Sequence, residues 1–164
     1  MKVIGIDPGF NKTGFGIVEQ NGSKLTVCEF GVIRPDTDAP LEQKLSCVFK
    51  EIQRLCELYK PDMASIEELF FVNNVRSGIK VGEMRGVLVL ACALAGIPVY
   101  HYTPKQIKQA VTGTGAADKE QVARMVQILT GAEVRKIPLD AYDALAAAVC
   151  HLNSWKMVRF LLPI

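Results

Sequence analysis

Acidic residues at three places in the chain have the types and spacing needed for metal-assisted chemistry. Asp7 follows the apolar run "KVIGI", Glu67 and Glu68 lie in "MASIEEL", and Asp140 and Asp143 stand three residues apart in "LDAYDALAAAVCH". A carboxylate at the end of a buried strand loses much of its hydration free energy. This loss is costly unless a cation or a hydrogen-bond donor compensates for it. Residues three apart on a helix share a face, so the two aspartates are expected to act together.

Carboxylates without a histidine or cysteine cluster are the ligands that Mg²⁺ and Mn²⁺ prefer. Two such ions, about 3.5–4 Å apart, can hold the attacking and leaving oxygens of a phosphodiester during in-line hydrolysis. Taken alone, Asp7 could be a turn residue, Glu67 or Glu68 a solvated strand end and Asp140 a charge at a helix start. Asp143, which an apolar run follows, fits an ordinary surface charge less well. Only the joint pattern favours a metal-dependent phosphodiesterase site.

The elements that position these acids begin with a predicted antiparallel meander. Strands are expected over residues 2–6, 13–20 and 24–33 because β-type residues dominate each run. The Asn21-Gly22 pair between the second and third runs is a strong hairpin signal. The chain therefore opens with three consecutive antiparallel strands.

Helices and strands then alternate. Apolar residues at three- and four-residue spacing predict a helix from Leu41 that ends before Pro61. A strand is expected over 63–69, a nearly all-apolar helix over 77–95 and another strand over 98–102. Such alternation indicates a sheet with parallel members.

Three helices are expected to follow. The stretches "TPKQ" and "DKEQ" each fit a capping box, and the last helix is expected to begin near Pro138. The order βββαβαβααα is the one that ribonuclease H-like folds use. Ligands of such sheets bind beyond the carboxyl ends of the strands, where Asp7 and one of Glu67 and Glu68 would meet. Strand alternation alone does not choose between the two glutamates.

Composition sets further limits. The 164 residues are 49% hydrophobic and 22% charged, which predicts one globular domain over residues 1–164, with 154–164 as a tail of uncertain role. The net charge of +2 neither demands nor excludes nucleic acid. Five cysteines without a Cys-x-x-Cys pair argue against a disulfide framework or a zinc site, and predict buried thiols in a cytoplasmic protein. No apolar run is long enough to cross a membrane.

Four blocks in register, "GIDPGFNKTGFGIV", "ASIEELFF", "KQIKQAVTGTGAADKEQV" and "DAYDALAAAVCH", resemble the RuvC family of Holliday-junction resolvases over about residues 1–153. The resemblance implies an α/β, ribonuclease H-like fold. Its mixed five-stranded sheet would join a three-stranded antiparallel meander to parallel strands, with helices on both faces. The family's four metal-binding acids fall on Asp7, Glu67, Asp140 and Asp143, which favours Glu67 over Glu68.

The resemblance also implies an activity. Family members are homodimeric endonucleases that nick two like-polarity strands of a four-way DNA junction in recombination and repair. Two Mg²⁺ ions per subunit are expected with DNA bound, with Mn²⁺ as a substitute, and a branch-migration complex of RuvA and RuvB is an expected partner.

Further residues follow from the alignment of these blocks. Lys108 and Lys119 match family lysines near the scissile phosphate, and Phe70 matches an aromatic residue that stacks at the opened junction. Additional DNA contacts are expected from Phe71, Arg76, Lys80 and Lys105. In isolation, each lysine would be a solvated helix charge and each phenylalanine a core residue.

Other functions stay open at the level of sequence. A sugar-kinase or actin-like protein also begins with a strand that bears an aspartate, but that fold needs about two domains of ordinary size. A catalytically silent junction-binding protein and a ribonuclease H-like nuclease that acts on RNA are the remaining alternatives. The apolar end "SWKMVRFLLPI" is either a docking tail or a packed segment.

Overall fold

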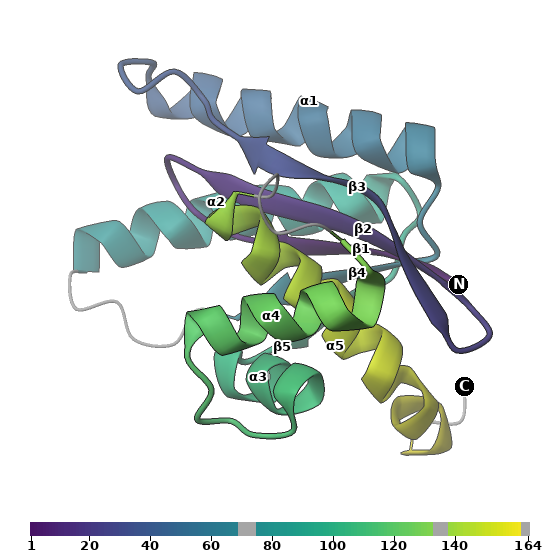
Figure 1. The fold of residues 1–164 in the computed structure, drawn as a ribbon. Coiled ribbons are helices and arrows are strands. Elements are labelled where there is room, and N and C mark those ends of the chain that lie inside the picture. Colours follow the sequence, from purple (N-terminus) through teal and green to yellow (C-terminus); the bar gives the residue numbers. More distant parts are fainter. Residues whose placement is uncertain (69–74, 133–137, 162–164) are drawn as a thin grey trace.

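The computed structural model describes residues 1–68, 75–132 and 138–161, with residues 75, 76 and 156–161 described in backbone only. A mixed sheet of order β3-β2-β1-β4-β5 forms its centre (Figure 1). The meander consists of β1 (Lys2–Asp7), β2 (Thr13–Asn21) and β3 (Lys24–Ile33). The parallel strands β4 (Met63–Glu67) and β5 (Val99–Tyr102) extend the sheet from β1. The expected fold class is confirmed.

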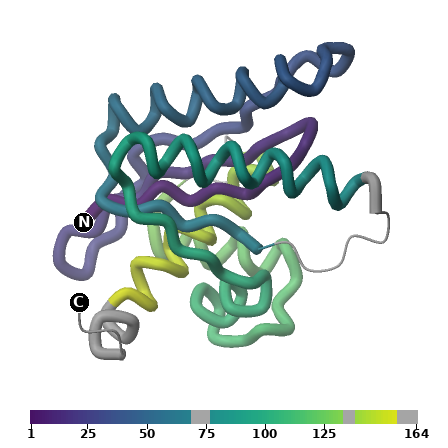
Figure 2. Tube along the Cα trace, turned by 180° about the vertical axis from the view of Figure 1, so that it is seen from behind, coloured from purple at the N-terminus to yellow at the C-terminus, as the bar shows by residue number. Residues whose placement is uncertain are grey.

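Helices cover both faces of the sheet. On one face α1 (Leu41–Tyr59) and α2 (Val75–Leu94) lie side by side, as Figure 2 shows from behind. On the other face lie α3 (Pro104–Thr112), α4 (Lys119–Thr130) and α5 (Leu139–Leu161). Each helix layer has its own buried apolar cluster against the sheet, so apolar side chains cover both faces of the sheet.

The close approach of α5 to the sheet depends on glycines and alanines. A Cβ on Gly5 would overlap the carbonyl oxygen of Ala144, and one on Gly14 would overlap the carbonyl oxygen of Asp140. The alanines of the buried run 144–148 present only methyl groups to the strands. The helix can therefore lie directly on β1 and β2, and its first turns reach the end of β1 that carries Asp7.

The two capping boxes form as predicted. The Thr103 hydroxyl accepts a hydrogen bond from the Gln106 N–H at 3.2 Å, and Asp118 Oδ1 accepts one from the Gln121 N–H at 2.8 Å. Each cap satisfies an otherwise orphaned N–H and fixes where its helix begins. The starts of α3 and α4 are thereby set beside the strand ends, with Lys119 as the first residue of α4.

Some sequence-based expectations need correction. The strand after Pro61 ends at Glu67 rather than at residue 69, and residue 69 itself lies outside the described part. Cys47 is exposed and Cys28 is half-buried, because both lie on outer surfaces of their elements; the expectation of buried thiols holds only for the other three cysteines, Cys56, Cys92 and Cys150.

The beginning of the apolar C-terminal segment is packed. The Trp155 ring lies edge-on to Tyr100, with 5.6 Å between the ring centroids, and 5.5 Å from the ring of the buried His151. His151 Nδ1 is 2.8 Å from the hydroxyl of Tyr102, so this buried histidine has a structural role. The side chains of residues 156–164 lie outside the description. Within the described residues, no helix combines the length and apolar character that a bilayer span requires.

Candidate active site

Two of the acids meet because their strands are parallel neighbours. The register pairs Ile6 with Ile66, so Asp7 and Glu67 come next at the same level of the sheet. Both strands end there, and both side chains are half-buried. The Glu67 side chain follows the alternation of Ser65, whose hydroxyl donates a 2.7 Å hydrogen bond to the Ala147 carbonyl of α5. Glu67 therefore lies on the α5 face of the sheet.

The three helices of that face complete a cavity of about 270 Å³ above the strand ends. Asp7 and Glu67 form its floor, and α5 contributes Asp143. Lys108 comes from α3 and Lys119 from α4. Five residues predicted from scattered parts of the sequence thus line one cavity, together with Pro104, Ile107, Val122 and Ala146.

Asp140 lies one turn before Asp143 on α5 and does not line this cavity. It is half-buried, its backbone carbonyl packs against Gly14, and its charge reaches Asp7. Asp140 therefore lies near Asp7, next to the start of β2. Glu68, which strand alternation had left open, does not line the cavity either.

The carboxylates disfavour one another's charge. Burial raises the pKa of Asp7 from 3.8 to about 6, with further increases from the charges of Asp143 and Asp140, while Lys119 opposes them. Burial likewise raises the pKa of Glu67 from 4.5 to about 7, helped by Asp7 and Asp143. In each case desolvation and like charge act in the same direction. Burial and the neighbouring negative charges therefore both disfavour the ionised form of Asp7 and Glu67 in this cavity.

Lys119 makes the one ion pair that the described residues form inside the cavity. Its Nζ donates to Asp143 Oδ2 at 2.9 Å, and this carboxylate raises the pKa of Lys119 above its usual range. The lysine side chain is 73% exposed, so it lies at the rim, where solvent and a substrate can reach it. Lys108 also faces the acids, because its charge opposes the rise in the pKa of Glu67.

The donor set fits a hard divalent cation. Asp7, Glu67 and Asp143 present only carboxylate oxygens, which is the chemistry that Mg²⁺ and Mn²⁺ select. Their mutual repulsion is the kind of electrostatic strain that a bound cation relieves. Among residues 1–68, 77–132 and 138–155, no three acid, histidine or cysteine side chains are already close enough together to form a metal site.

The remaining predicted DNA contacts are dispersed. Lys105 is exposed on the first turn of α3, where its aliphatic stem packs beside Gly115. Lys80 lines a second cleft on the opposite face of the sheet. Phe70 and Phe71 lie outside the described residues, and so does the side chain of Arg76.

A strand order of β3-β2-β1-β4-β5, with acids at the carboxyl ends of β1 and β4, defines a nuclease of the ribonuclease H-like class. The model of the family "Crossover junction endodeoxyribonuclease RuvC" matches residues 3–151. The chain belongs to this RuvC family.

Individual relatives agree with this assignment. The crossover junction endodeoxyribonuclease RuvC of Brevibacillus brevis is 44% identical over 92% of this chain and 91% of its own length. That of Syntrophomonas wolfei is 43% identical over 98% and 94%. A Thermus thermophilus RuvC, solved in complex with a Holliday junction substrate, superposes with a TM-score of 0.91 and 33% identity over 96% of each chain. The yeast mitochondrial Holliday junction resolvase Ydc2, at 13% identity and a TM-score of 0.70, shares the fold.

Proposed function

We propose that this protein is a structure-selective DNA endonuclease that resolves four-way (Holliday) junctions during homologous recombination and DNA repair. It hydrolyses one phosphodiester in each of two like-polarity strands. The observation that carries the proposal is the convergence of Asp7, Glu67 and Asp143 with two lysines in one cavity, in a chain of the RuvC family.

Mg²⁺ is the proposed cofactor, with two ions per subunit when DNA is bound and Mn²⁺ as a substitute. Asp7, Glu67, Asp140 and Asp143 are the proposed ligands. A bound divalent cation supplies Lewis-acid stabilisation of phosphoryl oxygens and lowers the pKa of water. The protein holds Asp7 and Glu67 on rigid neighbouring strands, so these carboxylates keep their separation while a substrate enters.

The two lysines act on the substrate phosphate. Lys108 and Lys119 place positive charge at the wall and the rim of the cavity, where the negative charge of the scissile group increases in the transition state. The ion pair with Asp143 orients the Lys119 ammonium toward the cavity before DNA arrives. We assign both lysines a catalytic role, and Lys105 a role as a phosphate contact.

The active form is proposed to be a homodimer. Two large apolar side chains in the C-terminal half of α2 are more than half exposed in the single subunit: Leu90 and Leu94. Burying them against a second copy would remove an apolar face from water, and a two-fold dimer matches a junction that is nearly two-fold symmetric. We propose that each subunit is one ribonuclease H-like domain over residues 1–164, that the dimer acts in the cytoplasm, and that RuvA and RuvB present the junction to it.

The test compares an end-labelled four-way junction having a mobile core with a linear duplex of the same sequence, in Mg²⁺ and in EDTA. The wild-type protein is expected to make symmetric nicks in the junction alone, and only with the metal. Asp7→Asn is the matched variant, expected to bind without cutting. Junction binding without cuts by the wild type would favour a silent binding protein. Cleavage of RNA or of RNA–DNA hybrids in preference to the junction would favour the RNA nuclease.

A further inference from the structure

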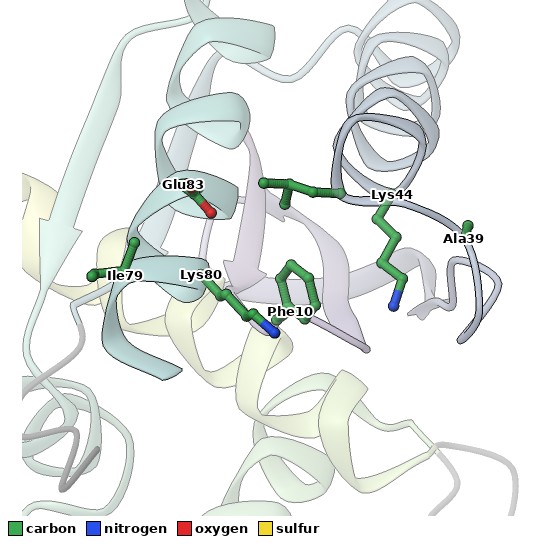
Figure 3. A pocket seen from close by; sticks show the side chains of 7 residues that line it. Phe10, Ala39, Lys44, Ile79, Lys80 and Glu83 are labelled. Atoms are coloured by element: carbon green, nitrogen blue, oxygen red, sulfur yellow. The ribbon is translucent and has the colours of Figure 1, made fainter. Parts of the chain in front are cut away.

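A second cleft lies on the opposite face of the sheet from the carboxylate cavity, and its size is about 410 Å³ (Figure 3). It opens between the first turns of α1 and α2 and the loop that joins β1 to β2. Phe10, from this loop, stands in the middle with Lys44 of α1 on one side and Lys80 of α2 on the other. The apolar walls are Leu41 and Ile79.

The cleft gathers positive charge around an aromatic ring. The Nζ atoms of Lys44 and Lys80 each lie 5.0 Å from the centroid of the Phe10 ring, within the range of a cation–π interaction. The ring thus lies between two ammonium groups and interacts favourably with both. Glu83 is the single acid among the lining residues.

Lys44 is the more informative of the two lysines. It is only 6% exposed, and its Nζ donates to the Thr37 carbonyl at 2.7 Å. Among the described residues, ion pairs form between Arg54 and Glu51 and between Lys119 and Asp143, so no described carboxylate is in direct contact with Lys44 or Lys80. A buried ammonium without a counter-charge is costly, and an anion that enters the cleft would relieve that cost.

The start of α1 adds to this field. Leu41 is the first residue of the 19-residue helix, and Pro40 before it gives no side-chain cap. The Gln43 N–H donates to the Pro40 carbonyl at 3.1 Å, and Glu42 places a negative charge in the first turn, so the helix start contributes only a weak positive field. The buried and the exposed lysine are the groups that favour a phosphate.

The position of the cleft identifies which phosphate. Phe10 follows Asp7 by three residues, so their Cα atoms are at most about 11 Å apart by the reach of an extended chain. Each nucleotide of a DNA strand advances about 3.4 Å along the helix axis. We infer that the Phe10–Lys44–Lys80 cleft binds a backbone phosphate of a junction arm within a few nucleotides of the bond held at Asp7. This inference rests on the proposed function, because it needs DNA at the carboxylate cavity.

The experiment measures junction affinity by fluorescence anisotropy between 50 and 200 mM NaCl. The slope of log K against log[salt] is negative, and loss of one phosphate contact makes it shallower by about 0.9. The ratio of the affinities at the two salt concentrations then shrinks about 3.5-fold. This result is expected for Lys80→Gln, and for Lys44→Met, which keeps the buried aliphatic stem. Glu83→Gln is expected to tighten binding. Lys24→Gln, which removes the same charge from the hairpin turn at the other end of the sheet, is the control.

The outcomes distinguish a failure of the cleft inference from a failure of the proposed function. A wild type that cuts junctions, with a salt slope unchanged in both Lys80→Gln and Lys44→Met, would overturn the inference and leave the function intact. If the wild type neither binds nor cuts junctions, both proposals fail. A second arm adds inorganic phosphate without DNA. Phosphate could stabilise the folded wild type but not Lys80→Gln, while the junction salt slopes stay unchanged. That result would make the cleft a site for a free anion and overturn the DNA contact.

Discussion

Replacing Asp7 by asparagine is expected to stabilise the metal-free protein while abolishing cleavage. The carboxyl has a pKa of about 6 in the folded chain against 3.8 for an unperturbed aspartate. This rise of about two pH units corresponds to about 3 kcal/mol, at about 1.4 kcal/mol per unit. At pH 7.5 the wild type holds the ionised form that burial and Asp143 disfavour, whereas asparagine keeps the shape without the charge.

The pH dependence of the free energy of unfolding follows from the raised pKa of Asp7. The folded chain binds the Asp7 proton more tightly than the unfolded chain, so the free energy of unfolding falls as the pH rises through the interval from about 4 to about 6. Above pH 6 the full cost is present in the wild type and absent in the variant. The stability gain of Asp7→Asn should therefore be largest at pH 7.5 and shrink as the pH falls toward 4.

Urea denaturation in EDTA at pH 7.5 and at pH 4.5 measures this difference, with the exposed Asp38→Asn as the control. Adding Mg²⁺ should stabilise the wild type more than Asp7→Asn, because the ion binds the folded site. The variant should bind a four-way junction as well as the wild type or better, since a charge that repels phosphate is gone. Equal stability of both proteins at pH 7.5, or an equal gain at both pH values, would refute the electrostatic reasoning.

Three further changes test the fold, the site and the proposed dimer. Gly5→Ala should destabilise the protein by about 3 kcal/mol or more in urea denaturation, because the new Cβ collides with the backbone of α5; Gly82→Ala, with no described atom within 4 Å of its added Cβ, should cause no such loss. Lys119→Gln should slow single-turnover cleavage about 100-fold with little change in junction affinity, and a rate within twofold of wild type would remove this residue from the catalytic group. The double variant Leu90→Glu/Leu94→Glu should sediment as a folded monomer, and a dimer that survives it would place the interface elsewhere.

Local sequence information was sufficient for most of the architecture. The hairpin at Asn21-Gly22, the capping boxes at Thr103 and Asp118 and the helix periodicity after Leu41 are interactions between near neighbours, which the order of residues specifies directly. Resemblance to one family then selected Glu67 over Glu68, a choice that strand alternation could not make.

The sequence alone thus predicted which residues would carry the chemistry: the strand-end acids, the aspartates on the last helix and the two lysines. Only the tertiary structure decided which of them share a cavity: Asp143 and Lys119 line it, and Asp140 does not. It also brought Phe10 together with Lys44 and Lys80, a cluster that the sequence did not suggest because no motif or local pattern links its three members. The physical reason is that these distances depend on how closely α5 and the α1–α2 layer approach the sheet, which side-chain packing between distant parts of the chain determines.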